Sequence, residues 1–167
     1  MKHSDWCTHI NNPEDRDILT RKLFDVNMRL FRANDSYRAL VQKVCEFIEY
    51  STMTEKEGYK KPHGYSGANA GIPWNIIGIA HAHGDATVMI NPMYTPVEKE
   101  GKRVVKSNCG SLTLPEPIEI TRWNRINVSY YDVFGEYNRL ENVGPSPGFT
   151  IQHEVEHNLG ILITDQK

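Results

Sequence analysis

The most regular pattern of hydrophobic and polar positions lies between residues 34 and 50. Hydrophobic side chains recur there at spacings of three and four residues, at Leu40, Val41, Val44, Phe47 and Ile48. This spacing places them along one face of a helix, and residues 34–36 (Asn-Asp-Ser) are of the types that cap helix N-termini. The pattern predicts an amphipathic helix whose apolar face packs on the core, with Cys45 as a small buried residue beside it.

The middle of the chain is typical of short strands. Residues 75–80 and 87–90 are rich in β-branched and other apolar residues, and Gly84-Asp85 between them predicts a turn. Residues 118–120 and 126–132 are the next strand candidates, the second alternating Ile126, Val128 and Tyr130 on one side. The charged stretch 96–106 predicts an exposed hairpin or loop.

Helices are predicted toward both ends of the chain. Residues 14–33 fit one helix or a turn and a short helix, while the polar residues 1–20 are expected to be loosely held. Glycines and prolines predict a loop over 58–73, and Pro145, Pro147 and Gly148 predict another. A last helix is predicted from about residue 149, with the apolar residues Ile151, Val155, Leu159 and Leu162. Strands in the middle and helices at the ends indicate a single α+β domain over residues 1–167.

Composition and charge exclude several classes of protein. The 167 residues are 39% hydrophobic and 24% charged, which is ordinary for a globular domain. The formal net charge is -2 and Lys and Arg form no dense run, which argues against direct nucleic-acid binding. The longest apolar stretch, around residues 76–80, is too short to cross a membrane, and no signal or transit peptide is evident. Three widely spaced cysteines (Cys7, Cys45 and Cys109) favour reduced thiols in a cytoplasmic protein.

The candidate chemistry lies in the segment His153-Glu154-Val155-Glu156-His157. In a helix the two histidines are four residues apart and lie on one face, one turn above the other. Two imidazoles placed in this way can bind one metal ion, with Glu154 beside it to transfer protons. Taken alone, the motif also arises by coincidence, in a helix that carries two ordinary histidines.

A catalytic site of this kind needs a third protein ligand and an open position for water. Ile163 stands where metzincin proteases have a third histidine, and the ten residues after His157 leave no room for a second helix. Upstream, His81 and His83 alternate at a strand end and are a weaker candidate pair. Cys109 lies in a turn of small residues, where a thiol could face a cavity and be held as thiolate by a metal.

Three motifs, in the same order, resemble those of peptide deformylases. Residues 151–160 (IQHEVEHNLG) are similar to the QHExDHLxG motif of that family, and the Cys109-Gly110-Ser111 turn resembles its EGCLS motif. Residues 64–73 (GYSGANAGIP) resemble the family's glycine-rich segment that ends in a glutamine. Ile90-Asn91-Pro92 also falls where the family often has an INP strand end. The resemblance covers roughly residues 34–165.

The resemblance implies antiparallel sheets packed around a central C-terminal helix that carries HExxH, with an N-terminal helix. It implies an enzyme that removes the N-formyl group from the N-terminal formyl-methionine of nascent peptides. One divalent metal ion per chain, expected as Fe2+ with Zn2+, Ni2+ or Co2+ as replacements, would be bound by Cys109, His153 and His157. Glu154 would act as general base and acid while metal-bound water attacks the formyl carbon.

The same resemblance implies roles for further residues. The developing oxyanion would receive hydrogen bonds from the Asn69 side chain and from the backbone N–H of Gly110. The peptide would be bound near the metal helix and two loops, by His63, Gly64, Asn108, Phe149 and Thr150.

The chain departs from the family at three positions of these motifs. Asn69 replaces a glutamine and is one methylene shorter, and Gly110 replaces a leucine. Ser107 replaces an acid that in relatives pairs with an arginine, for which Arg122 is the candidate here. These changes predict a divergent member of the family with an altered substrate pocket.

Two other functions stay open from the sequence. One is an amide or formamide hydrolase of the same scaffold with a different, non-ribosomal substrate, and the other is a non-catalytic metal-binding relative. The intact Glu154 argues against the second, because a structural metal site has no use for a base. For a deformylase, the expected partner is a formyl-methionyl nascent peptide met at the ribosome exit. We expect no nucleic-acid or membrane partner, a monomer, and a cytoplasmic location in a bacterial cell or a phage-infected host.

Overall fold

The protein is described by a computed structural model over residues 7–55, 62–112 and 114–166. In chain order its elements are α1 (Pro13–Leu19), α2 (Met28–Ala33), α3 (Asp35–Met53), β1 (Gly64–Ser66), α4 (Gly67–Ala70), β2 (Ile76–Ala80), β3 (Ala86–Pro96), η2 (Glu98–Glu100), β4 (Lys102–Ser107), β5 (Ile118–Trp123), β6 (Ile126–Tyr131), β7 (Tyr137–Val143), α5 (Pro145–Asn158) and η3 (Ile163–Gln166). None of the helices in these ranges is long and apolar enough to cross a membrane.

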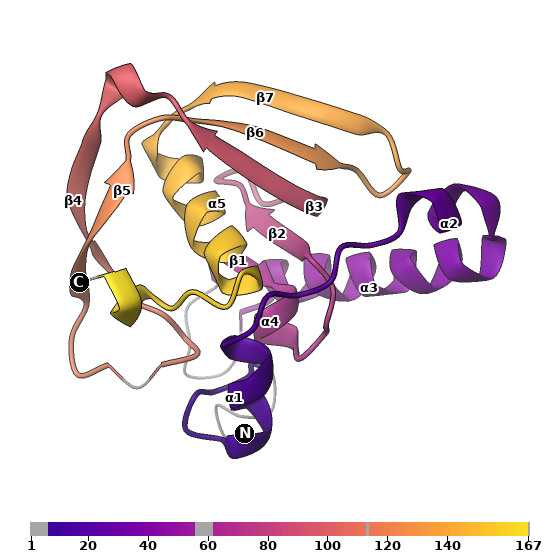
Figure 1. Ribbon diagram of the computed structural model, residues 1–167, viewed down its shortest axis with the longest axis horizontal. Coiled ribbons are helices and arrows are strands. Elements are labelled where there is room, and N and C mark those ends of the chain that lie inside the picture. The colour runs from indigo at the N-terminus through magenta and orange to yellow at the C-terminus, as the bar shows by residue number, and fades with distance from the viewer. Residues whose placement is uncertain (1–6, 56–61, 113, 167) are drawn as a thin grey trace.

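Two antiparallel sheets surround helix α5. Five strands form one sheet in the order β1-β2-β3-β6-β7, and β4 pairs with β5 in a separate hairpin. Figure 1 shows α5 in the middle of the molecule, with the hairpin on one side of it and the larger sheet on the other. The predicted α+β fold, with antiparallel sheets around a C-terminal helix, is confirmed.

Strand β2 and the adjoining part of β3 are buried on both faces, and their alternate side chains pack against two different helices. Ile76 and Ile90 pack with the apolar face of α3, whereas Ile77 and Met89 pack with α5. Helix α3 lies so close to β2 that a Cβ atom at Gly78 would fall 2.2 Å from Thr52 Oγ1. This packing fixes the sheet as a platform on which α5, the helix with the candidate chemistry, is held.

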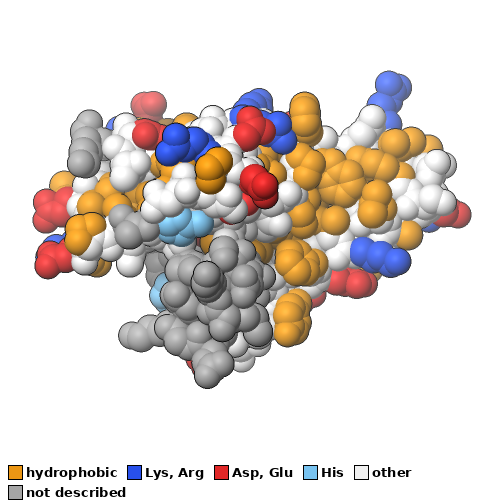
Figure 2. Space-filling view, turned by 90° about the horizontal axis from the view of Figure 1, so that it is seen from below, with side chains coloured by type: hydrophobic (Ala, Val, Ile, Leu, Met, Phe, Trp, Pro, Cys, Tyr) orange, Lys and Arg blue, Asp and Glu red, His pale blue; other side chains and the backbone are white. Residues whose placement is uncertain are grey.

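The strongest sequence patterns predicted their elements correctly. Helix α3 begins after Asn34, whose side chain accepts a hydrogen bond from the Tyr37 backbone, and Cys45 is buried on it. The predicted strands correspond to β2, β3, β5 and β6. Two residues of the predicted apolar stripe are nevertheless exposed, Leu40 by 52% and Phe47 by 44%. Figure 2 shows hydrophobic side chains gathered over the part of the molecule that carries α2 and α3.

Other predictions need correction. Pro145, Pro147 and Gly148 are not a loop but the first turns of α5, because a proline needs no N–H partner at the start of a helix. The charged stretch 96–106 contains β4, and the loop predicted over 58–73 contains β1 and α4, with residues 58–61 outside the described ranges. Strand β7 was not predicted, because it is an exposed edge strand without alternating apolar residues.

The N-terminal segment is packed, in contrast to the expectation of a loosely held segment over residues 1–20. Thr8 N–H donates to Asn69 O at 2.8 Å, and Ile10 N–H donates to Ser111 O at 3.0 Å. Helix α1 buries Ile18 and Leu19. The polar composition of this segment did not reveal these contacts, because its backbone makes most of them. Residues 1–6 lie outside the described part of the chain.

Candidate metal centre

Two buried amide side chains hold helix α5 in place. At its middle, Gln152 accepts a hydrogen bond from Trp123 N–H at 2.9 Å and donates to Trp123 O at 3.0 Å, which ties α5 to β5. At its end, Asn158 donates to Ile76 O and accepts from Ala68 N–H, which ties α5 to β2 and α4. The face of α5 that carries the two histidines is therefore fixed against three elements.

Three candidate metal ligands come together on this face. His153 and His157 lie one turn apart on α5, with ring centroids 4.6 Å from each other. Cys109, in the turn that follows β4, places its Sγ 3.1 Å from His157 Nε2. One ligand atom from each of the three residues lies within 4.8 Å of the other two. These distances suit one ion bound by all three side chains.

The electrostatics of the three ligands also fit a cation. Burial lowers the pKa of His157 to about 4 and lowers that of His153 well below its usual value, so both imidazoles are neutral with a free lone pair. Burial raises the pKa of the Cys109 thiol to about 12. A divalent ion would reverse this preference, because a nearby positive charge stabilises the thiolate. One sulfur and two nitrogen donors suit iron, zinc, nickel or cobalt.

Glu154 lies beside these ligands in a dry environment. Burial raises the pKa of its carboxyl group to about 8, and a hydrogen bond from Ser66 and the charge of Arg122 oppose this rise. Its Oε2 is buried and has no hydrogen-bond partner among the described residues. Without a metal ion, the carboxyl group is therefore mostly protonated at neutral pH, but its pKa lies close enough to neutrality for proton transfer in both directions.

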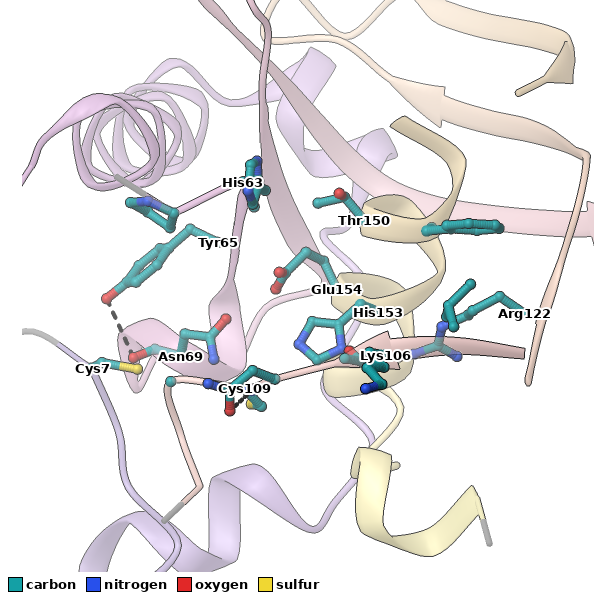
Figure 3. A pocket seen from close by; sticks show the side chains of 17 residues that line it. Cys7, His63, Tyr65, Asn69, Lys106, Cys109, Arg122, Thr150, His153 and Glu154 are labelled. Carbon is teal, nitrogen blue, oxygen red and sulfur yellow. Dashed lines mark hydrogen bonds between the residues drawn. The ribbon is translucent and has the colours of Figure 1, made fainter. Parts of the chain in front are cut away.

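A pocket of about 510 Å3 opens in front of the centre, and the predicted site residues line it, His157 excepted. The lining includes the substrate-binding candidates His63, Gly64, Asn108, Phe149 and Thr150. Figure 3 shows His153 and Glu154 projecting from α5 into the space that Asn69 and Cys109 face from the opposite side. His81 and His83 lie elsewhere, stacked on each other after β2 with centroids 5.6 Å apart.

The two oxyanion candidates differ in how free their donors are. Asn69 Oδ1 accepts from the backbone and hydroxyl of Ser66, and one N–H of its Nδ2 donates to Ser111 Oγ at 2.9 Å. The second N–H of Nδ2 is available to the pocket. Gly110 is exposed in the turn, and its N–H has no backbone partner within the described ranges.

Comparison with known proteins assigns the chain to a family. The family model of polypeptide deformylases matches residues 10–167. The chain belongs to the peptide deformylase family. The peptide deformylase of Chloroflexus aurantiacus is similar, at 35% identity over 94% of this chain and 84% of that protein. The peptide deformylase of Wolinella succinogenes is 32% identical over 75% of this chain and 74% of the relative.

Solved structures of peptide deformylases have the same fold. The crystal structure of the Thermotoga maritima enzyme matches with a TM-score of 0.73 and 25% identity, over 96% of this chain and 95% of that one. A class I type b peptide deformylase from Acinetobacter baumannii matches with a TM-score of 0.75 and 22% identity, over 97% and 98%.

Peptide deformylases are metal-dependent hydrolases of protein biosynthesis that remove the N-formyl group from nascent peptides. Family membership gives this chain the same activity on formyl-methionyl peptides. The comparisons offer no support for the alternatives of a different amide substrate or a non-catalytic relative.

In this deformylase Ser107 stands where relatives have an acid that pairs with an arginine, and Arg122 pairs with Glu156 instead. Arg122 Nη1 donates to Glu156 Oε2 at 2.5 Å, and Glu156 also accepts from Tyr94 Oη and from Gln166 Nε2. Glu156 belongs to the HEVEH segment itself, so the ion pair joins β5 directly to the metal helix. The sequence offered one signal for it, an acid inside the motif, but not its partner.

Sequence reasoning also missed two residues beside the pocket. Cys7 lies buried at the pocket wall, with its Sγ 3.3 Å from Ser111 Oγ. Ser111 links Cys7 to Asn69 and thereby orients the amide of Asn69. The position of Cys7 could not be read from the chain, because it depends on how the N-terminal segment packs against the turn after β4.

Proposed function

We propose that deformylation by this chain takes place at Cys109, His153 and His157, with one divalent metal ion bound by all three side chains. The observation that carries the proposal is the convergence of the three ligand atoms within 4.8 Å, beside the buried carboxyl group of Glu154. When bound, the ion would act as a Lewis acid that makes water nucleophilic near neutral pH. The resemblance to the family suggests Fe2+ as the native metal, and the same sulfur and nitrogen donors also accept Zn2+, Ni2+ or Co2+ as replacements.

Glu154 is the general base and then the general acid. Its carboxylate takes a proton from the attacking water and returns it to the amine that leaves when the formyl C–N bond breaks. Burial suits both steps, because it brings the pKa of Glu154 to about 8 and keeps competing water away from the carboxyl group. The charge of Arg122 partly opposes this rise in pKa.

Asn69 and Gly110 stabilise the negative charge that develops on the formyl oxygen. The second N–H of Asn69 Nδ2 and the backbone N–H of Gly110 both belong to the pocket wall and need no reorganisation during the reaction. The peptide lies along His63, Gly64 and Asn108, and its first side chain lies against Phe149 and Thr150 on α5. Such a peptide would extend the sheet at its β1 edge.

The test compares the wild-type protein with Glu154→Gln, both loaded anaerobically with Fe2+ or Ni2+, on formyl-Met-Ala-Ser. We expect the variant to retain its metal and to lose most of its turnover, on the order of 100-fold or more, because only the base is removed. Equal turnover by the two proteins would refute the role of Glu154. Three further expectations stay predictions: that the enzyme binds the nascent peptide at the ribosome exit, that it is a monomer, and that it is cytoplasmic.

A further inference from the structure

The two oxyanion donors come from parts of the chain that lie far apart in the sequence. Asn69 belongs to α4, and Gly110 belongs to the turn after β4. Residues 7–10 (the bridging segment) contact both parts. Toward α4, Thr8 N–H donates to Asn69 O at 2.8 Å and Thr8 Oγ1 donates to Ala68 O at 2.6 Å. Thr8 is buried, so water does not compete for these bonds, and they fix the backbone of α4 at the residue that carries the amide.

The bridging segment also contacts the turn after β4. Ile10 N–H donates to Ser111 O at 3.0 Å, and Cys7 Sγ lies 3.3 Å from Ser111 Oγ. Ser111 is fully buried and directly follows Gly110. Figure 3 shows Cys7 beside Asn69, on the side of the pocket away from α5. The bridging segment therefore holds α4 and the turn at a fixed separation, and with them the two oxyanion donors.

The short side chain of Asn69 makes its amide depend on the backbone of α4. Asparagine has one rotatable bond fewer than glutamine, so it has less freedom to correct a displaced backbone. The amide is also held at both ends, because Oδ1 accepts from Ser66 N–H at 2.9 Å and Nδ2 donates to Ser111 Oγ at 2.9 Å. A shift of α4 relative to the turn would strain these bonds and move the second N–H of Nδ2, and a misplacement of about 1 Å can lower a rate about 100-fold.

We propose that Thr8 is a positioning residue of the reaction, which holds α4 where Asn69 and Gly110 can donate to the same oxygen. The inference rests on the proposed function, since it takes these two groups as the oxyanion donors. Among the described residues, Cys7 lines the pocket and Thr8 does not, so Thr8 touches no substrate and acts through Asn69. Loss of the Thr8 contact should therefore weaken stabilisation of the charged oxygen, which develops only in the transition state, and leave substrate binding nearly unchanged.

Replacement of Thr8 by valine would separate the bridging segment from α4. Valine has the shape of threonine, but a methyl carbon keeps about 3.3–3.6 Å from a carbonyl oxygen. In the same rotamer, Thr8→Val would therefore displace the segment from Ala68 O by about 0.7–1 Å. Ala68 O keeps its hydrogen bond from Gly71 N–H at 3.2 Å, so the variant leaves no unpaired carbonyl at Ala68 and should fold.

The experiment measures kcat and KM of the nickel-loaded proteins on formyl-Met-Ala-Ser. Thr8→Val should lower kcat about 10-fold and change KM less than about twofold. Thr8→Ser keeps the hydroxyl and should retain most of the wild-type kcat. Thr52→Val is the matched control, because it also removes a buried hydroxyl that donates to a carbonyl, that of Ile48 at 2.7 Å, but in α3 and outside the pocket lining. It should lower the midpoint of urea unfolding without lowering kcat.

A double-mutant cycle tests whether Thr8 acts through Asn69. Asn69→Asp lacks the N–H donors, so adding Thr8→Val to it should lower kcat less than about twofold further. If Thr8→Val does not fold, Cys7→Ala takes its place in the cycle with the same expectation, because it removes the contact of the bridging segment with Ser111. Cys7→Ser, which keeps a donor for Ser111, is then the conservative variant that should retain kcat.

The possible results separate this inference from the proposed function. An unchanged kcat in Thr8→Val, a loss of the same size in the Asn69→Asp background, or a similar loss in Thr52→Val would overturn the inference alone. A raised KM with an unchanged kcat in Thr8→Val would do the same. Absence of turnover by the wild type would instead overturn the proposed function and this inference with it.

Discussion

The buried carboxyl group of Glu154 should make the metal-free protein less stable as the pH rises. Burial raises its pKa from the ordinary 4.5 to about 8, so the folded state holds a proton that the unfolded chain releases. Between these two pKa values the unfolded state binds fewer protons, and the free energy of unfolding falls with increasing pH. Glu154→Gln should lack this fall, because an amide does not titrate.

The size of the effect follows from the same two pKa values. At about 1.4 kcal/mol per pKa unit, the carboxyl group destabilises the wild type by about 2 kcal/mol at pH 6 and about 4 kcal/mol at pH 8. The stability advantage of Glu154→Gln should therefore grow by about 2 kcal/mol over this range. His153 and His157, whose pKa values burial lowers, act in the opposite direction at the lower end of the range. Both proteins keep these histidines, so their difference isolates the carboxyl group.

Urea denaturation of the metal-free proteins in the presence of a chelator, at pH 6, 7 and 8, measures this difference. Glu119→Gln makes the same chemical change at an exposed position of β5 and should show no such growth. A stability advantage of Glu154→Gln that stays constant or shrinks between pH 6 and pH 8 would refute the reasoning. Nickel should reduce the growth, because a bound cation stabilises the carboxylate beside it.

Three further predictions concern the groups that build the site. Gln152→Ala should lower the free energy of unfolding by about 2–4 kcal/mol in urea titrations, because both backbone groups of Trp123 lose their partner; an unchanged midpoint would contradict this. Cys109→Ala should lower the metal bound per chain after dialysis, measured by atomic absorption, and full retention would exclude Cys109 as a ligand. Asn69→Asp keeps the acceptor for Ser66 but loses the N–H donors. It should lower kcat about 100-fold with a smaller effect on KM, and a raised KM with unchanged kcat would indicate a binding role instead.

The sequence could predict those helices and strands whose formation depends on residues close together in the chain. The spacing in α3 and the Asn34 cap act within one helix, and the alternation in β6 reports burial on one face. Strand β7 is defined only by its pairing with β6, and α5 starts earlier than expected because Pro145 is compatible with a first helical turn. Local periodicity therefore does not predict which strands pair, or where a helix that starts with proline begins.

The same distinction holds for the site. His153, Glu154 and His157 follow from helical spacing, and Cys109 follows from the resemblance to a motif. The partner of Arg122 did not follow, since the acid expected near Ser107 is absent and Glu156 reaches Arg122 only when the hairpin packs on α5. Cys7 was placed in a loose segment, because its contact with Ser111 joins residues 104 positions apart.

Gly64 gives the active site a mutational constraint that its chemistry does not reveal. It has no side chain, and a Cβ atom there would fall 2.6 Å from Thr150 Cγ2 and 2.7 Å from Glu154 Cγ. Any other amino acid at position 64 would push the general base or the edge strand out of place. The backbone of β1 at Gly64 therefore lies in direct contact with the side chain of the general base, Glu154. A substitution at position 64 would require a shift of this side chain or of the strand.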